Sequence, residues 1–232
     1  KIRLSMDLNL IKQRLDALNS TRNQTDSNAD KFWRPVDGKQ TIRIVPSAFD
    51  KNNPFTELRF HTVIHKFPIL ALTNFGAIDP VEEFRSQLQQ LGGKDNWSMS
   101  GKLTPKASYY VPVIVRGEEE KGVRLWRFGI TIYKALLSLA ADEEIGDFTD
   151  IVNGTDLIVE RTPAATSASY PEITVRPKRA SSALSDDPKE AKKWLTEQPN
   201  PIECFKRWDY DSVKSALQSY LSGGAHTPAP VQ

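Results

Sequence analysis

The chain has 232 residues, 39% of them hydrophobic, and its 31 Lys and Arg residues nearly balance 29 Asp and Glu residues to give a net charge of +2. This length suits one large domain or two small ones with a real hydrophobic core. No apolar run approaches the ~18 residues of a membrane-spanning helix, and the single cysteine, Cys204, excludes a disulfide framework and a multi-cysteine metal site. We therefore expect a soluble, intracellular protein that does not bind a membrane.

The first nineteen residues have the pattern of an amphipathic helix. Their apolar residues recur at spacings of four and three, at Leu4, Leu8, Ile11, Leu15 and Leu18. The basic residues of this segment are Lys1, Arg3, Lys12 and Arg14. Residues 20–31 are polar and lack an apolar face, which predicts a flexible linker. We expect residues 1–19 to form an arm that docks onto a neighbouring molecule, but a helix packed on its own domain explains the stripe equally well.

From Phe32 onward the apolar pattern changes to the period of two that is typical of strands. Strands are expected at residues 41–45, 58–65, 109–115, 123–128, 156–160 and 172–176. The polar turn at residues 116–122 is bracketed by glycines and predicts a hairpin between two of these strands. The pattern predicts an α+β chain whose strands form a small barrel or sandwich.

Helices are expected between these strands. The first begins at Asp79, an N-cap acid followed by Pro80 and, three residues after the cap, by Glu82, and it ends before Gly92. Further helices are predicted at residues 132–141, from Pro188 onward, and at residues 210–221. Residues 223–232 are small and polar, which predicts a disordered tail.

The motifs of common catalytic and cofactor sites are absent, because the chain has no P-loop, nucleophile elbow, zincin motif or dinucleotide fingerprint. We therefore expect neither an enzyme nor a bound cofactor. The one spacing typical of metal ligands is His61 and His65, which would share one face of a strand near Asp79, Glu82 and Glu83. This pair keeps open a metal-dependent nuclease or phosphoesterase, whereas the simpler interpretation is polar residues on a solvated strand.

The small net charge conceals an uneven distribution. Residues 142–160 carry seven acidic side chains and no basic one, so the rest of the chain carries +9. Residues 1–46 hold nine basic and five acidic side chains. Such asymmetry is a signal of nucleic-acid binding. We expect the acidic block to lie away from a binding cleft or at its mouth.

Aromatic and basic residues gather in the predicted hairpin, after Lys102 and Lys106. On its second strand Arg124 and Trp126 share one face, which predicts a platform where bases stack. Aromatic residues that fill a β core explain the same cluster. A second candidate is the small-residue loop that presents Tyr170, followed by the basic residues Arg176, Lys178 and Arg179.

The hairpin sequence at residues 106–115 and 123–129, and residues 32–35 leading into 42–47, resemble the single-stranded DNA-binding replication protein of T4-like bacteriophages. The resemblance follows the family's order of elements over residues 32–180. It implies an OB-fold core, a five-stranded β-barrel over residues 32–222, with a helical insertion at about 66–107. It also implies that the protein coats single-stranded DNA cooperatively and without sequence preference during phage replication, recombination and repair, in the cytoplasm of the infected bacterium.

The resemblance implies roles for particular residues and partners. The DNA-cleft aromatics that it matches are Trp97, Tyr109, Tyr110, Trp126 and Tyr170, and the matching basic residues are Lys106, Arg124 and Arg127. Lys102, Arg176 and Lys178 are further candidates for phosphate contacts. The arm at residues 1–19 would join neighbouring protomers, and a phage polymerase and helicase loader are the expected protein partners. A protein–protein adaptor that acts mainly through this arm is the remaining alternative.

Two features depart from this family. Many relatives hold one zinc with a histidine and three cysteines, but here the cysteine positions fall near Leu72, Asp79 and Glu82. A capping box at Asp79 and Glu82 offers a metal-free way to fix the helix, so we predict no structural zinc. Relatives also often end in an acidic tail that recruits partners, whereas this chain stops at Gln232 without one, which predicts either a shortened chain or loss of that function.

Overall fold

The computed structural model describes residues 28–166 and 169–223. The predicted arm at residues 1–19, most of the predicted linker and nearly all of the predicted tail lie outside these residues. The described strands are β1 (Phe32–Trp33), β2 (Gly38–Ile44), β3 (Thr56–His61), β4 (Ile69–Leu70), β5 (Lys106–Val115), β6 (Arg124–Phe128), β7 (Thr155–Thr162) and β8 (Glu172–Ser181). The described α-helices are α2 (Pro80–Leu91), α3 (Lys94–Lys102), α4 (Ile130–Ala140), α5 (Pro188–Thr196) and α6 (Tyr210–Leu221), and short 3-10 helices include η1 (Leu72–Phe75) and η3 (Pro201–Cys204).

The strands form one open, mixed sheet, so the predicted α+β class is confirmed. Its order is β1-β6-β5-β2-β7-β8, and off this path β3 pairs with β5 and β4 pairs with β3. Strand β5 holds the sheet together because its first half pairs with β3 and its last three residues pair with β2. Along its other edge β5 pairs with β6, which confirms the predicted hairpin. Among the described strands no pairing closes the sheet into the predicted barrel.

Most predicted elements are found within a few residues of their expected ends, and α6 has the predicted bounds. Strands β7 and β8 are longer than expected, and β1, β4 and α3 were not predicted individually. The predicted strand that begins at residue 58 ends early, at His61, so His65 does not belong to it.

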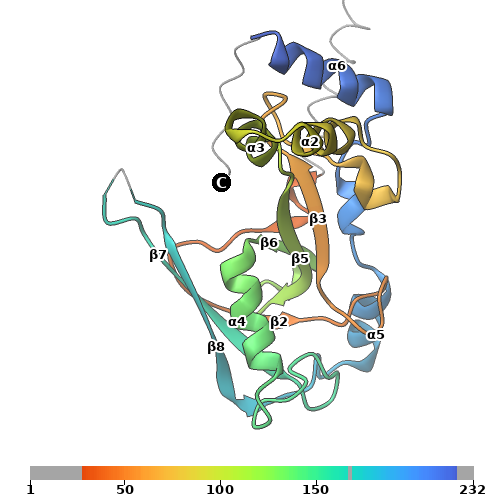
Figure 1. Ribbon diagram of the computed structural model, residues 1–232. Coiled ribbons are helices and arrows are strands. Elements are labelled where there is room, and N and C mark those ends of the chain that lie inside the picture. The colour runs from red at the N-terminus through yellow and green to blue at the C-terminus, as the bar shows by residue number, and fades with distance from the viewer. Residues whose placement is uncertain (1–27, 167–168, 224–232) are drawn as a thin grey trace, which may run out of the picture.

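Two main cores lie on different parts of the sheet. The larger core packs α4 against residues of β2, β5, β6 and β7. The second core joins α2, α3 and α6, which we call the helical lobe, to the chain around β4. Figure 1 shows the helical lobe gathered at one end of β3 and β5, and the β7–β8 hairpin reaching outward from the sheet.

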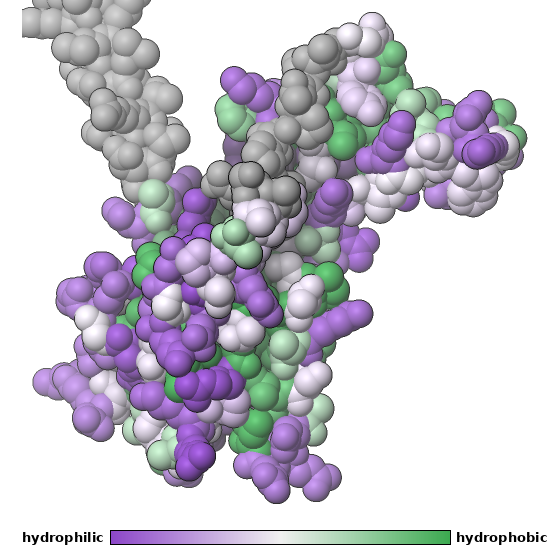
Figure 2. Space-filling model, turned by 90° about the vertical axis from the view of Figure 1, so that its left-hand side faces the viewer, coloured by the Kyte–Doolittle hydropathy of each residue, from purple (hydrophilic) through white to green (hydrophobic). Residues whose placement is uncertain are grey.

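The surface mixes hydrophilic and hydrophobic residues. On the face seen in Figure 2 hydrophilic residues predominate, and a band of hydrophobic residues shows between them. Apolar atoms make up roughly half of any folded surface, so an isolated exposed hydrophobic side chain is not by itself a site. Within the described residues, no helix has the length and apolarity to cross a membrane.

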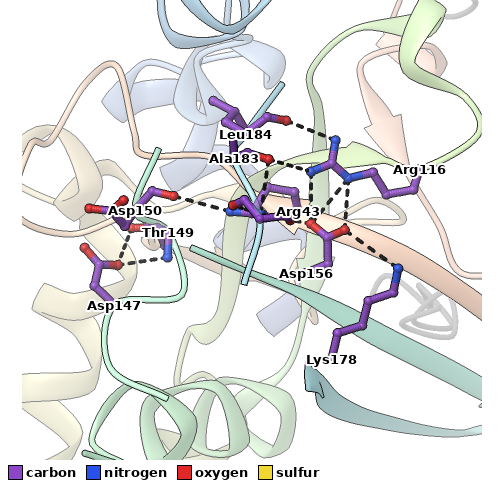
Figure 3. A network of polar contacts seen from close by, with 10 residues as sticks. Arg43, Arg116, Asp147, Thr149, Asp150, Asp156, Lys178, Ala183 and Leu184 are labelled. Carbon is purple, nitrogen blue, oxygen red and sulfur yellow. Dashed lines mark hydrogen bonds and ion pairs between the residues drawn. The ribbon is translucent and has the colours of Figure 1, made fainter. Parts of the chain in front are cut away.

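A buried arginine links β2 to β7 and to the end of β8. Arg43 is fully buried, and its Nε donates to Asp156 Oδ1 at 2.8 Å. Its other nitrogens donate to the carbonyl oxygens of Asp150 and Ser182. Figure 3 shows Arg116 and Lys178 turned toward the same Asp156 carboxylate. Asp156, part of the acidic block predicted from sequence, is therefore a partner for Arg43, Arg116 and Lys178 rather than part of a separate acidic lobe.

Gly154 lies where no side chain fits. A Cβ at this position would come within 2.2 Å of the Asp150 carbonyl oxygen and 2.4 Å of Arg43 Nη1. We expect Gly154→Ala to lower the free energy of unfolding by about 1–3 kcal/mol, the usual cost of overpacking, in urea denaturation. Gly101→Ala is the matched control, because Gly101 lies in α3 with no atom near its Cβ position and alanine favours helix there. Equal effects of the two substitutions would contradict the prediction.

Candidate nucleic-acid interface

One face of the β3–β5–β6 sheet carries polar and aromatic side chains side by side. The strand register places Phe60 opposite Lys106 and Tyr110 opposite Arg127. Because side chains alternate along a strand, Lys106, Ser108 and Tyr110 of β5 point to the same side of the sheet. This face also borders the helical lobe, and it lies on elements that sequence analysis already associated with binding.

An aromatic layer covers the centre of this face. Phe205, which follows η3, lies with its ring centroid 5.0 Å from that of Phe60 and 5.7 Å from that of Tyr110. Tyr110 is fully buried beneath it, and among the described residues its hydroxyl has no hydrogen-bond partner. Burial raises the pKa of Tyr110 to about 12, so the phenol stays neutral at physiological pH.

Three basic side chains surround this layer. Arg127 Nη2 donates to Ser108 Oγ at 3.1 Å, and its guanidinium lies 5.8 Å from the Phe60 ring centroid. The Arg207 guanidinium lies 4.3 Å from the Phe75 ring centroid, a cation–π distance. Within the described residues, Lys106, Arg127 and Arg207 form no ion pair with a carboxylate. We call this set, Lys106, Arg127, Arg207, Phe75 and Phe205, the basic–aromatic strip.

The β7–β8 hairpin is a second exposed surface. Tyr170, which follows the loop and precedes β8, is 85% exposed. Arg176 and Lys178 are exposed on β8, and Lys178 Nζ lies 3.9 Å from Asp156 Oδ2. The structure therefore places one exposed ring and two cations on the same hairpin.

Four residues predicted at the interface are buried. Trp126 is 0% exposed and packs on Trp33, and Tyr109 is covered by a stacked Tyr133 ring whose centroid lies 3.9 Å away. Tyr110 lies under Phe205, as described above. Arg124 is buried and its Nη2 lies 2.6 Å from Glu118 Oε2. This corrects the expected Arg124–Trp126 platform, because both side chains are enclosed and neither presents a surface to a base.

The remaining predicted residues lie at the surface. Trp97 is 56% exposed on α3, and Lys102 is exposed at the end of the same helix. Lys106 and Arg127 belong to the basic–aromatic strip. Sequence analysis missed Phe75, Phe205 and Arg207, although the run Phe205-Lys206-Arg207-Trp208 places two basic residues between two aromatic ones and was a detectable signal.

The two histidines do not come together. His61 is buried at the end of β3, and its Nε2 lies 2.8 Å from Asp79 Oδ2. His65 lies beyond the strand, and its ring packs on Trp208. In the part of the chain that the structure describes, no group of three or more His, Cys, Asp or Glu side chains has an arrangement that could hold a metal ion. His61 and His65 therefore do not form the pair of metal ligands that the nuclease alternative requires.

Asp79 caps α2 differently from the predicted capping box. Its carboxylate accepts hydrogen bonds from the backbone amides of Val81 and Leu72 as well as contacting His61. Burial alone would raise the pKa of Asp79, but these contacts outweigh burial and hold its pKa below the ordinary value. Glu82 does not complete a capping box, because its carboxylate pairs with Arg85. The result is a buried hub that joins β3, η1 and α2.

The residues present do not fit the zinc site that the family resemblance implies. Of the positions matched to cysteines, Leu72 has an apolar side chain and Glu82 is paired with Arg85. The Asp79 carboxylate is already occupied by His61 and by two backbone amides. His61 points at Asp79 rather than at an open site. Hydrogen bonding thus holds the positions that a metal would hold in a zinc-binding relative.

We expect chelation to leave the protein folded. Thermal unfolding with and without EDTA should give the same midpoint, because the hub at Asp79 uses no metal ligand set. Asp79→Ala is the positive control and should lower the midpoint, since it removes a helix cap and leaves His61 without its partner. A midpoint that falls on chelation, together with about one zinc per chain by metal analysis, would contradict this prediction.

Comparison with known proteins gives one family match. A family model described as "gp32 DNA binding protein like" matches residues 36–220, which is well over half of the chain. The matched range includes all of the basic–aromatic strip and the β7–β8 hairpin. No curated protein matches the sequence.

Proposed function

The chain belongs to the gp32-like family of DNA-binding proteins, and on that premise we propose that it binds single-stranded DNA along the basic–aromatic strip. The observation that carries this proposal is a set of three cations on one face of β3–β5–β6 that have no carboxylate partner among the described residues, two of them over aromatic rings. Cations bind phosphates, and exposed rings stack with bases of any identity. The proposed activity is binding without catalysis and without a cofactor.

The order of the strands supports this location. Strands β2, β5, β6, β7 and β8 occur in this order in the chain, with β3 and β4 inserted between β2 and β5. Strand β5 is antiparallel to β2 and β6, and β7 is antiparallel to β2 and β8. We propose that they correspond to the five strands of an OB-fold, which is a partly open barrel. Such folds bind oligonucleotides on their second and third strands and on the loop between the fourth and fifth. Those parts are here β5, β6 and the loop before Tyr170.

The proposed contacts divide by chemistry. Lys106, Arg127 and Arg207 meet phosphates at the strip, and Arg176 and Lys178 meet them along β8. Tyr170, and Trp97 on the helical lobe, supply exposed rings for stacking. These contacts are to the backbone and to ring faces, so we expect little discrimination between base sequences.

We further propose that copies of the chain coat the strand cooperatively through residues 1–19 during phage replication, recombination and repair in the host cytoplasm. The leucine stripe and basic residues of that segment support a contact between protomers. Phage replication proteins such as a polymerase and a helicase loader are the proposed partners.

A salt titration tests the proposed site. We expect the affinity for oligo(dT), measured by tryptophan fluorescence or filter binding, to fall linearly with salt on logarithmic axes, because each phosphate contact releases counterions. Lys106→Ala should reduce this slope by about 0.7, the value for one contact to a single strand.

Lys192→Ala, on α5, is the matched control and should leave the slope unchanged. Binding that does not respond to salt, or equal effects of the two substitutions, would count against the site. Incubating labelled strands with magnesium separates coating from nuclease activity, because a coat protein leaves the strand intact.

A further inference from the structure

A groove lies where the chain after β3 meets α6 in the helical lobe. Its volume is about 530 Å3. One side is formed by Ile64, His65 and Trp208, and the other by α6 residues, namely Asp211, Ser212, Ser215, Ala216 and Ser219. We call it the α6 groove. Helix α6 lies at the outer edge of the lobe in Figure 1.

The rim of the α6 groove repeats the chemistry of the basic–aromatic strip. The Lys206 ammonium lies 5.8 Å from the Trp208 ring centroid, and the Lys66 ammonium lies 5.5 Å from that of Phe67. The Trp208 ring packs edge-on against His65 at 5.1 Å, and Phe67 is 60% exposed. In the described part of the chain, neither lysine forms an ion pair with a carboxylate.

One short segment connects the groove to the strip. Phe205 and Arg207 contact the rings of the strip, while Trp208, the next residue along, contacts His65 at the groove. Adjacent residues of one irregular segment therefore line the strip and the groove.

We propose that the α6 groove is a second subsite for single-stranded DNA, which extends the path of the strand beyond the strip. A base lies in the groove against Trp208, and the adjoining phosphates meet Lys66 and Lys206. The serine hydroxyls of α6 offer donors and acceptors to the sugar and base. This subsite rests on the proposed function, because the strand must first be bound at the strip.

The carboxylate of Asp211 restricts which side of the groove the DNA backbone can follow. It lines the groove on the α6 side, where it repels phosphate. The backbone of the strand must therefore run along the opposite rim, over the two lysines, with its base turned inward. Removing this charge should strengthen binding, an effect that a purely structural residue would not produce.

A series of oligo(dT) lengths tests the subsite with the full chain. Short oligonucleotides that fill only the strip should bind native protein and the variants Lys206→Ala and Phe67→Ala equally. Longer ones should bind these variants about fivefold or more weakly, because Lys206→Ala removes a phosphate contact and Phe67→Ala removes the ring over which Lys66 lies. Asp211→Asn should bind the longer ones more tightly than native protein. Phe49→Ala removes a similarly exposed ring beside the end of α5 and should have no effect at any length.

The outcomes separate the two proposals. If native protein binds long and short strands but Lys206→Ala, Phe67→Ala and Asp211→Asn bind every length like native protein, the groove is not a DNA subsite, and a protein segment would be its occupant. If native protein binds no oligonucleotide, the proposed function itself fails. Thermal unfolding of each variant checks that the fold is kept, which is expected because Lys206, Phe67 and Asp211 are exposed.

Discussion

Asp156→Ala is expected to lower the free energy of unfolding by about 3–5 kcal/mol, the range for breaking a buried ion pair by removing one partner. The carboxylate of Asp156 accepts from Arg43, which is fully buried, and from Arg116. Without it the Arg43 guanidinium stays enclosed with only carbonyl and hydroxyl partners. Urea denaturation at neutral pH measures the loss, and a change below ~1 kcal/mol would show that the network contributes little.

The same carboxylate predicts how stability responds to acid. Burial alone would raise the pKa of Asp156, but the bonds from Arg116 and Arg43 outweigh it and hold the pKa below its ordinary value of 3.8. A depressed pKa contributes stability that is present above 3.8 and is lost as pH falls through the lower, folded value. Native protein should therefore lose more stability in this acidic window than Asp156→Asn, which has no carboxylate to protonate. Parallel acid profiles of the two proteins would contradict the assignment.

Tyr170→Ala is expected to weaken binding of single-stranded DNA by about 1–3 kcal/mol, or roughly 5- to 150-fold, the cost of removing one base-stacking ring. The side chain is 85% exposed, so its removal should leave the free energy of unfolding within about 0.5 kcal/mol of native. Fluorescence titration with oligo(dT) measures the affinity.

Two controls make this result specific. Tyr170→Phe keeps the ring and should bind like native protein, because stacking needs the ring face rather than the hydroxyl. Tyr110→Phe removes a buried hydroxyl that has no hydrogen-bond partner in the described part of the chain, so it should leave the free energy of unfolding unchanged or raised, and DNA binding intact. Equal binding by Tyr170→Ala and native protein would show that Tyr170 on the β7–β8 hairpin does not stack with the DNA.

The sequence predicted the elements better than it predicted the exposed surface. Period-two patterns located β2, β5 and β6, and the Asp79-Pro80 signal located the start of α2. Alternation along β6 correctly placed Arg124 and Trp126 on one face, but it did not reveal that α4 packs on that face and encloses Trp126. Which side of a sheet is covered depends on elements distant in the chain, and a single strand's pattern carries no such information.

The same limit explains the residues that were missed. Phe205 and Arg207 lie in an irregular segment with no helical or strand period, and their role depends on contact with Phe60 and Phe75, more than a hundred residues earlier. The hub at Asp79 is comparable, because its capping was predicted, whereas its proximity to His61 was expected only for a metal site and not as a direct contact. Local signals located the cap, and only the fold located its partner.

Strand β5 has a mechanical consequence. It runs for ten residues, pairing with β3 next to the helical lobe and with β2 in the body of the sheet. A swing of the lobe about this junction would require ladder hydrogen bonds to break, whereas hinges form where few bonds cross. The lobe and the sheet should therefore move as one stiff unit. Binding and release of single-stranded DNA would then depend on the movement of single side chains and short loops, and not on closure of the lobe onto the sheet.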